Sequence, residues 1–319
     1  MKKRVFSYIK AIIALIILFL VLRTIDFAKV SNILSSVELS YVITAGILVI
    51  LLLFVKSVRW NLIINQFNDR LTIGESFSIY MSSYSVGVVT PGRLGEFIKV
   101  YNLRHSTNLS PLNSFLTVIA DRVYDLVTLF VFGTAGLIVY LLHLPFSPLI
   151  YLSLVIFVFV IAFVVNYIFL VISKASKLKW VSFLNELSRI VFNIRRYREW
   201  TITIFAYAIY FLAAWLLFLG ITNNITYFET VFIMATLSLV LLLPITIAGF
   251  GTREYSLIIL LGMFNIPSEV AISFSILQLS VFFGFGGLVG LIFFLKNPVP
   301  LSEVKNDMVN LKGLVVKWK

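Results

Sequence analysis

The chain has 319 residues, of which 60% are hydrophobic and 13% are charged. Soluble domains carry roughly 45–50% apolar and about 25% charged residues, so this composition excludes a soluble protein. The mean hydropathy of +1.02 and the many long apolar runs predict an all-α polytopic integral membrane protein. The net charge of +12 then indicates basic cytoplasmic loops, not nucleic acid binding. With no Cys and two His, we expect no metal centre and no cofactor.

Nine apolar runs are candidates for membrane segments. The first follows Lys2, Lys3 and Arg4 and lacks a small-residue cleavage site, so we expect an uncleaved helix there. In chain order the runs span residues 5–22, 41–55, 73–89, 112–142, 149–172, 201–220, 228–247, 255–264 and 270–295.

The distribution of basic residues predicts the topology. The densest basic stretch, residues 174–198, should be cytoplasmic under the positive-inside rule. Counting outward from it gives cytoplasmic termini and about six full crossings. It also gives a cytoplasmic connection after residue 55 that carries Lys56, Arg59 and Arg70. The basic segment 298–319 becomes a cytoplasmic tail.

Two segments do not fit as full crossings and are predicted to be re-entrant helical pairs. Residues 71–104 should enter from the cytoplasm, break at residues 90–92 and return. Residues 228–264 should enter from outside and break at residues 248–251. Each break precedes a short helix, a proline-containing turn and a long span. We therefore predict one transmembrane domain, 1–319, built as an inverted repeat with halves of about 1–145 and 146–297. The alternative is a pair of Gly-rich kinks used only for helix packing.

Charged side chains lie in or beside these apolar segments, although a central Arg or Asp costs about 2.5–3.5 kcal/mol on insertion scales. They should face each other or a polar cavity. A spacing of three allows Arg93 to pair with Glu96 and Arg122 with Asp125, which would be a purely structural role. Arg253 and Glu254 are adjacent and should point about 100° apart, which disfavours pairing and favours a proton or substrate role for the two glutamates. The candidate translocation residues are Pro91, Gly92, Arg93, Gly95, Glu96, Asp121, Arg122, Asp125, Gly249, Gly251, Arg253 and Glu254.

Helices that begin at Gly92 and Thr252 would aim their N-terminal N–H groups at the membrane middle. Such helix ends favour an anion. With Arg93 and Arg253 beside them, they predict a phosphate site.

These motifs resemble those of a known family. Residues 91–96, 121–125, 243–246 and 249–254 are similar in sequence and order to the transmembrane region of lysylphosphatidylglycerol synthases, in its stand-alone form. The resemblance covers most of the chain. It implies the flippase-type half of those enzymes, which moves the lipid between leaflets, without the soluble synthase domain.

We therefore expect a lipid translocase in the plasma membrane, which moves an anionic phospholipid or a lipid-linked headgroup between leaflets through a polar path at the two re-entrant loops. Its lipid partners should be anionic or phosphate-containing. The chain has no phosphate-binding loop of the Gly-x4-Gly-Lys-Ser/Thr type, so a lipid gradient or protons would set the direction. One alternative is an intramembrane enzyme acting on lipid phosphates, with Asp121 and Asp125 as metal ligands one helical turn apart. Another is an accessory subunit of a separate synthase or glycosyltransferase. A homo-oligomer and a partner enzyme both stay open, and we expect no nucleic acid partner.

Overall fold

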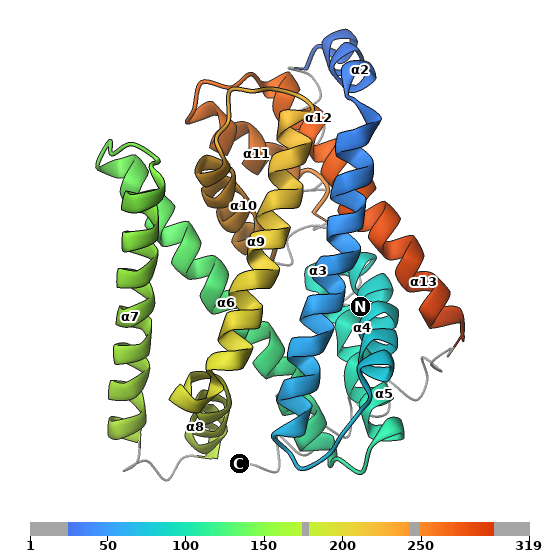
Figure 1. Ribbon diagram of the computed structural model, residues 1–319, viewed down its shortest axis with the longest axis vertical. Helices are drawn as coiled ribbons and strands as arrows, with labels where there is room; N and C mark the ends of the chain where they lie inside the picture. The colour runs from blue at the N-terminus through green and yellow to red at the C-terminus, as the bar shows by residue number, and fades with distance from the viewer. Residues whose placement is uncertain (1–24, 174–178, 243–248, 297–319) are drawn as a thin grey trace, which may run out of the picture.

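The computed structural model describes residues 25–173, 179–242 and 249–296, which are helical apart from short turns (Figure 1). The predicted first helix at 5–22, the tail at 298–319 and residue 248 of the second break lie outside the described residues. The elements are α2 (Phe27–Ser36), α3 (Leu39–Asn65), α4 (Ile73–Val88), η1 (Pro91–Phe97), α5 (Ile98–Ser106), α6 (Pro111–Leu141), α7 (Pro148–Ser173), α8 (Lys179–Phe192), η2 (Ile194–Arg196), α9 (Tyr197–Leu219), α10 (Tyr227–Leu242), α11 (Thr252–Gly262), α12 (Ser268–Gln278), η3 (Leu279–Phe285) and α13 (Gly286–Lys296).

Five of the described helices are long and apolar enough to cross a membrane. They are α3, α6, α7, α9 and the continuous helix formed by α12, η3 and α13. Each coincides with a run that the sequence predicted as a full crossing, so the all-α polytopic fold is confirmed. The π-helical segment η3 interrupts the last of these helices, and π-helical turns are frequent at functional sites.

The short helices of each half pack against the long helices of the other half. α4 lies along α13, α10 lies along α6, and α3 lies along α9. α4 and α5 occupy the lower part of Figure 1, whereas α10 and α11 occupy its upper part. Helices from before the middle of the chain therefore pack against helices from after it.

Two glycines allow this exchanged packing. A Cβ atom added to Gly290 of α13 would lie 2.5 Å from the carbonyl oxygen of Met81 in α4. A Cβ added to Gly136 of α6 would lie 2.5 Å from the Cβ of Phe232 in α10. Both distances are below van der Waals contact, so only glycine lets these helices approach so closely. Small residues serve the same purpose at many membrane helix interfaces.

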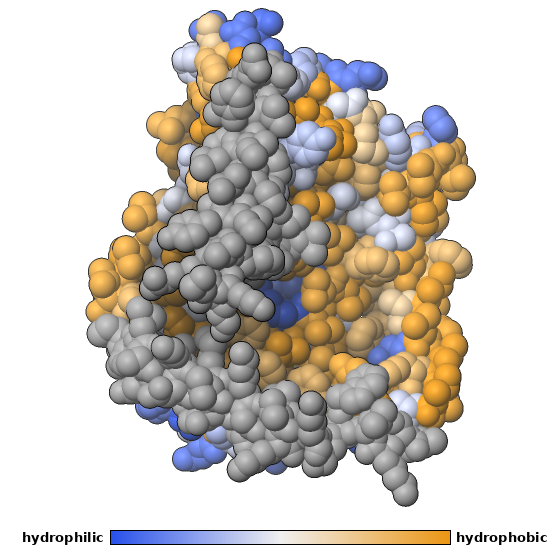
Figure 2. Space-filling model, turned by 180° about the vertical axis from the view of Figure 1, so that it is seen from behind, coloured by the Kyte–Doolittle hydropathy of each residue, from blue (hydrophilic) through white to orange (hydrophobic). Residues whose placement is uncertain are grey.

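The coloured part of the face in Figure 2 is mainly hydrophobic, while most of its hydrophilic residues lie near the two ends. α7 contributes strongly to this apolar surface, because Leu149, Ile156 and Val165 are each more than half exposed. Exposed apolar side chains on a spanning helix are typical of surfaces that face lipid.

We predict that Gly290→Ala destabilises the protein by about 1–3 kcal/mol, because the added methyl group must push α13 away from the backbone of α4. The measurement is thermal unfolding of the purified protein in detergent. Gly287→Ala is the matched control on the same helix, since its Cβ would meet Val88 at an ordinary 3.8 Å. Equal melting temperatures for the two variants would contradict the close approach of α4 and α13.

The predicted inverted orientation can be tested by labelling single cysteines, since the chain has no Cys of its own. Asn108 precedes α6 and is exposed, while Gly262 ends α11 with nothing within 4 Å of an added Cβ. We expect a membrane-impermeant maleimide to label Gly262→Cys in intact cells, and Asn108→Cys only after the membrane is opened. Labelling of both cysteines from the same side would contradict the predicted topology.

Candidate functional site

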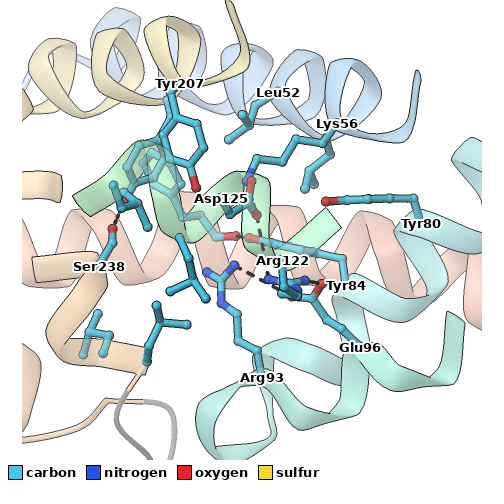
Figure 3. A pocket seen from close by; sticks show the side chains of 17 residues that line it. Leu52, Lys56, Tyr80, Tyr84, Arg93, Glu96, Arg122, Asp125, Tyr207 and Ser238 are labelled. Atoms are coloured by element: carbon cyan, nitrogen blue, oxygen red, sulfur yellow. Dashed lines mark hydrogen bonds and ion pairs between the residues drawn. The ribbon is translucent and has the colours of Figure 1, made fainter. Parts of the chain in front are cut away.

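A partly enclosed cavity of about 130 Å³ lies in the interior, bordered by α3, α4, η1, α6, α9, α10 and η3 (Figure 3). Its lining is mixed and contains charged groups, hydroxyl groups and leucine side chains. The polar lining residues are Lys56, Tyr80, Tyr84, Arg93, Glu96, Arg122, Asp125, Tyr207, Tyr210 and Ser238, and the apolar ones are Leu52, Leu53, Leu126, Leu129, Leu241, Leu242 and Phe282.

Arg59 of α3 is the centre of the charged network behind this cavity. Its side chain is fully buried, and its Nη2 and Nε donate to Oδ1 of Asp121 at 2.5 and 3.0 Å. Its Nη1 lies 2.9 Å from Oδ1 of Asp125 and donates to Thr203 at 3.2 Å. Arg59 thus joins α3 to α6 and α9. A planar guanidinium suits such a site because it can hold several oxygens at once.

Two lysines complete the pairing of the aspartates. Lys56 Nζ lies 2.9 Å from Oδ2 of Asp125. Lys99 Nζ lies 3.2 Å from Oδ2 of Asp121 and 3.5 Å from the ring centroid of Tyr80. Both aspartates therefore contact at least two cations in the low-dielectric interior, where an unpaired carboxylate would be very costly.

The prediction that Lys56 and Arg59 lie in a cytoplasmic connection is wrong. α3 continues to Asn65, so both residues lie within the helix and face the interior. The hydropathy run ends at Val55 because these cations follow it, yet the helix continues because their charges are paired within the protein. The sequence analysis also missed Lys99. The available signal for Lys99 was its helical spacing of three from Glu96, which allows an ion pair.

Glu96 connects η1 to this network. Its carboxylate contacts Arg122 directly and lies 3.5 Å from Nζ of Lys99. Arg93 lies 3.9 Å from Glu96, and Arg122 lies 4.0 Å from Asp125, so both predicted pairs are confirmed as long contacts. The closer partners of Glu96 and Asp125 come from other helices.

The backbone of η1 places Arg93 at the cavity. Arg93 has a φ of 55°, a left-handed conformation that costs a non-glycine residue about 1–3 kcal/mol. Thr90 holds this turn, because its carbonyl accepts from the N–H of Arg93 at 3.1 Å and its Oγ1 accepts from that of Gly95 at 2.7 Å. A Cβ on Gly95 would lie 2.5 Å from the Val86 carbonyl oxygen, which explains the glycine. The side chain of Arg93 is 39% exposed, more than any other charged residue of the network.

The network carries more positive than negative charge. Five cations against three carboxylates leave an excess of two positive charges. The cations are Lys56, Arg59, Arg93, Lys99 and Arg122, and the carboxylates are Glu96, Asp121 and Asp125. Buried charge of one sign favours binding of the opposite sign. The site is therefore suited to an anion that has an apolar part.

The second break is organised differently from the first. Gly249 and Gly251 have φ values of 79° and 82°, and Gly251 caps α11 by donating its N–H to Oε2 of Glu254 at 2.7 Å. Glu254 Oε1 accepts from Arg253 Nη2 at 2.8 Å and from Ser275 at 2.6 Å. The prediction that Arg253 and Glu254 point apart is therefore wrong. The long guanidinium stem folds back over the helix start, which adjacent Cα–Cβ directions alone do not reveal.

Phe283 of η3 links the two breaks. The guanidinium carbons of Arg93 and Arg253 lie 5.3 and 5.8 Å from its ring centroid, within cation–π range. Nη1 of Arg253 is buried and has no hydrogen-bond partner among the described residues. Nearby, Tyr84 donates to the Phe282 carbonyl at 2.5 Å, which anchors the π-helical turn to α4.

The structure thus groups some of the twelve predicted residues and separates others. Arg93, Glu96, Arg122 and Asp125 line the cavity, and Asp121 lies behind it. Pro91, Gly92 and Gly95 form the η1 backbone. The start of α11 is formed by Gly249, Gly251, Arg253 and Glu254. These four residues do not line the cavity.

Two comparisons with known proteins bear on this site. Residues 7–290 match the family described as the lysylphosphatidylglycerol synthase TM region. The chain is also 27% identical over 302 residues to a UPF0104 membrane protein of the archaeon Methanocaldococcus jannaschii. That alignment covers 85% of this chain and 89% of the relative. The family match therefore includes all the residues that line the cavity.

We predict that Glu254→Gln lowers the stability of the folded protein by about 3–5 kcal/mol, because it leaves the buried Arg253 without its counter-charge. The double variant Arg253→Gln, Glu254→Gln should recover part of the loss. Folded yield and thermal unfolding in detergent provide the measurement. Glu229→Gln is the control, since Glu229 accepts from the Thr226 backbone N–H as a comparable cap at the start of α10. Unchanged stability of Glu254→Gln would instead favour a proton or substrate role for this carboxylate.

Proposed function

Since the chain belongs to the family of the lysylphosphatidylglycerol synthase transmembrane region, we propose that it is a lipid translocase that moves an anionic phospholipid or lipid-linked phosphate between leaflets. In this proposal the headgroup occupies the cavity beside Arg93 and Arg122, and the acyl chains extend along apolar side chains. The substrate pathway lies between the two helical breaks. The protein acts in the plasma membrane with cytoplasmic termini.

One observation carries the proposal, namely the excess of two positive charges around an amphipathic interior cavity. A phosphate group would compensate this charge, and Arg93 is the member of the network best placed to bind it. Its guanidinium has one carboxylate contact, at 3.9 Å, and points toward the cavity (Figure 3). The leucines in the cavity lining suit the apolar part of a lipid.

The exchanged packing supports a second part of the proposal, that the chain is an inverted repeat. The contact between α4 and α13 is equivalent to the contact between α10 and α6 if the halves are related by a two-fold axis in the membrane plane. Phe283 then lies near one arginine from each break. Such a pair offers a headgroup successive cationic contacts, one from each break.

The rival proposal, an enzyme that uses Asp121 and Asp125 as metal ligands, is less well supported. Both carboxylates already contact cations from α3, and Asp121 also contacts Lys99. Among the described residues no group of three or more His, Asp or Glu side chains is arranged to hold a metal ion. An accessory role beside a separate enzyme has no particular observation in its favour.

We predict that Arg93→Gln slows lipid exchange about 10- to 100-fold while leaving the folded yield unchanged. A charge-assisted hydrogen bond contributes about 1.5–3 kcal/mol, whereas the half-exposed Arg93 adds little to the fold. Arg93→Lys should restore part of the rate. The measurement is loss of fluorescence of labelled phosphatidylglycerol and phosphatidylcholine in proteoliposomes exposed to an impermeant reductant.

The control for this experiment is Arg70→Gln, which removes an exposed arginine outside the cavity. It should exchange lipid at the wild-type rate. Wild-type exchange by the double variant Arg93→Gln, Arg253→Gln would show that the pathway lies elsewhere. Faster exchange of phosphatidylcholine than of phosphatidylglycerol by the wild-type protein would contradict an anionic substrate.

A further inference from the structure

A second pocket, of about 450 Å³, lies at the end of the molecule where α3 ends and α9 begins. α8 lies at the same end, at the foot of α9 (Figure 1). The pocket is more open than the central cavity and shares no lining residue with it. Three of its lining residues are arginines, Arg195, Arg196 and Arg198.

The charges of this pocket are also unbalanced. Glu199 is its single acidic lining residue, against the three arginines. Glu199 is already engaged, because its Oε1 accepts from Gln66 Nε2 at 2.8 Å and lies 3.8 Å from Arg196 Nη1. Arg195 and Arg198 are exposed, and Arg196 has a buried Nε with no acceptor among the described residues. The pocket thus offers guanidinium N–H groups to which an anion could bind.

The turn that carries these arginines is fixed by hydrogen bonds. Asn193 Oδ1 accepts from the N–H of Arg195 at 3.0 Å, and Trp200 Nε1 donates to the Val191 carbonyl at 2.9 Å. The arginine backbones are therefore positioned before any ligand binds, and this lowers the entropy cost of binding.

The surroundings indicate what kind of anion would bind. Tyr197 is 61% exposed, and the guanidinium of Arg198 lies 5.9 Å from its ring centroid. Aromatic and basic residues at the end of a spanning helix are typical of the membrane–water interface. Basic pockets between helices at this depth recognise anionic lipid headgroups.

We infer that this arginine pocket is a binding site for the phosphate of an anionic phospholipid headgroup at the membrane surface. It is separate from the proposed translocation cavity. Still, the two are joined by Thr203, which donates to the Glu199 carbonyl at 2.7 Å and accepts from Arg59 at 3.2 Å. A lipid held here would stabilise the ends of α3 and α9, the helices that also carry Lys56, Arg59 and Tyr207.

The test is lipid retention by the purified full-length protein, measured by native mass spectrometry during titration with phosphatidylglycerol or phosphatidylcholine. We expect the double variant Arg195→Gln, Arg198→Gln to bind phosphatidylglycerol about 10- to 30-fold more weakly than wild type, since each interfacial Arg contributes about 1 kcal/mol. The variant Arg195→Lys, Arg198→Lys should keep most of the affinity. Arg70→Gln, Arg189→Gln is the control with the same loss of charge at exposed positions outside the pocket.

Equal affinity of the Gln double variant and this control would overturn the inference. So would equal retention of phosphatidylglycerol and phosphatidylcholine by the wild-type protein. Displacement of the lipid by millimolar inorganic phosphate would assign the pocket to a soluble anion instead. Both double variants leave the lining of the central cavity unchanged, so the difference between them is independent of whether that cavity translocates lipid.

Discussion

The ion pairs of Arg59 with Asp121 and Asp125 are the interaction on which the rest of the interior depends. A charged side chain with no solvent access can persist in a membrane protein only if its charge and hydrogen bonds are satisfied internally. Arg59 meets this condition by contacting α6 through both aspartates and α9 through Thr203. Since α3, α6 and α9 are all candidate spans, these contacts set the relative positions of three crossings.

A second constraint is the close approach of helices across the two halves. Gly290 and Gly136 bring the short helices α4 and α10 against the long helices of the opposite half. This packing places α4 and α10 against long helices. Backbone groups freed at a helix end are tolerated at membrane depth only where protein covers them, so such contacts favour a broken segment.

The two breaks resemble each other in sequence but differ in charge. Arg253 and Glu254 form a neutral pair, and the carboxylate is used fully as a helix cap and as a partner of Ser275. In the first half, Glu96 is shared among Arg93, Lys99 and Arg122, and cations outnumber carboxylates. The excess positive charge therefore lies at the first break and not at the second. This asymmetry gives the proposed headgroup site one position of strongest binding and leaves Arg253 Nη1 as a secondary donor.

The sequence by itself determined the membrane-embedded helical class, five of the described spans and the polar segments around residues 91–96, 121–125 and 249–254. These follow from hydropathy and from the cost of charge in lipid, which act locally along the chain. Only the tertiary structure decided which charges meet. Three cations, Lys56, Arg59 and Lys99, contact aspartates that are 22 to 69 residues away in sequence. No local spacing encodes such a pairing. Likewise, Arg253 pairs with its neighbour because its flexible side chain folds back toward Ser275 of α12. Long cationic side chains reach across helices, so their partners depend on how the helices pack.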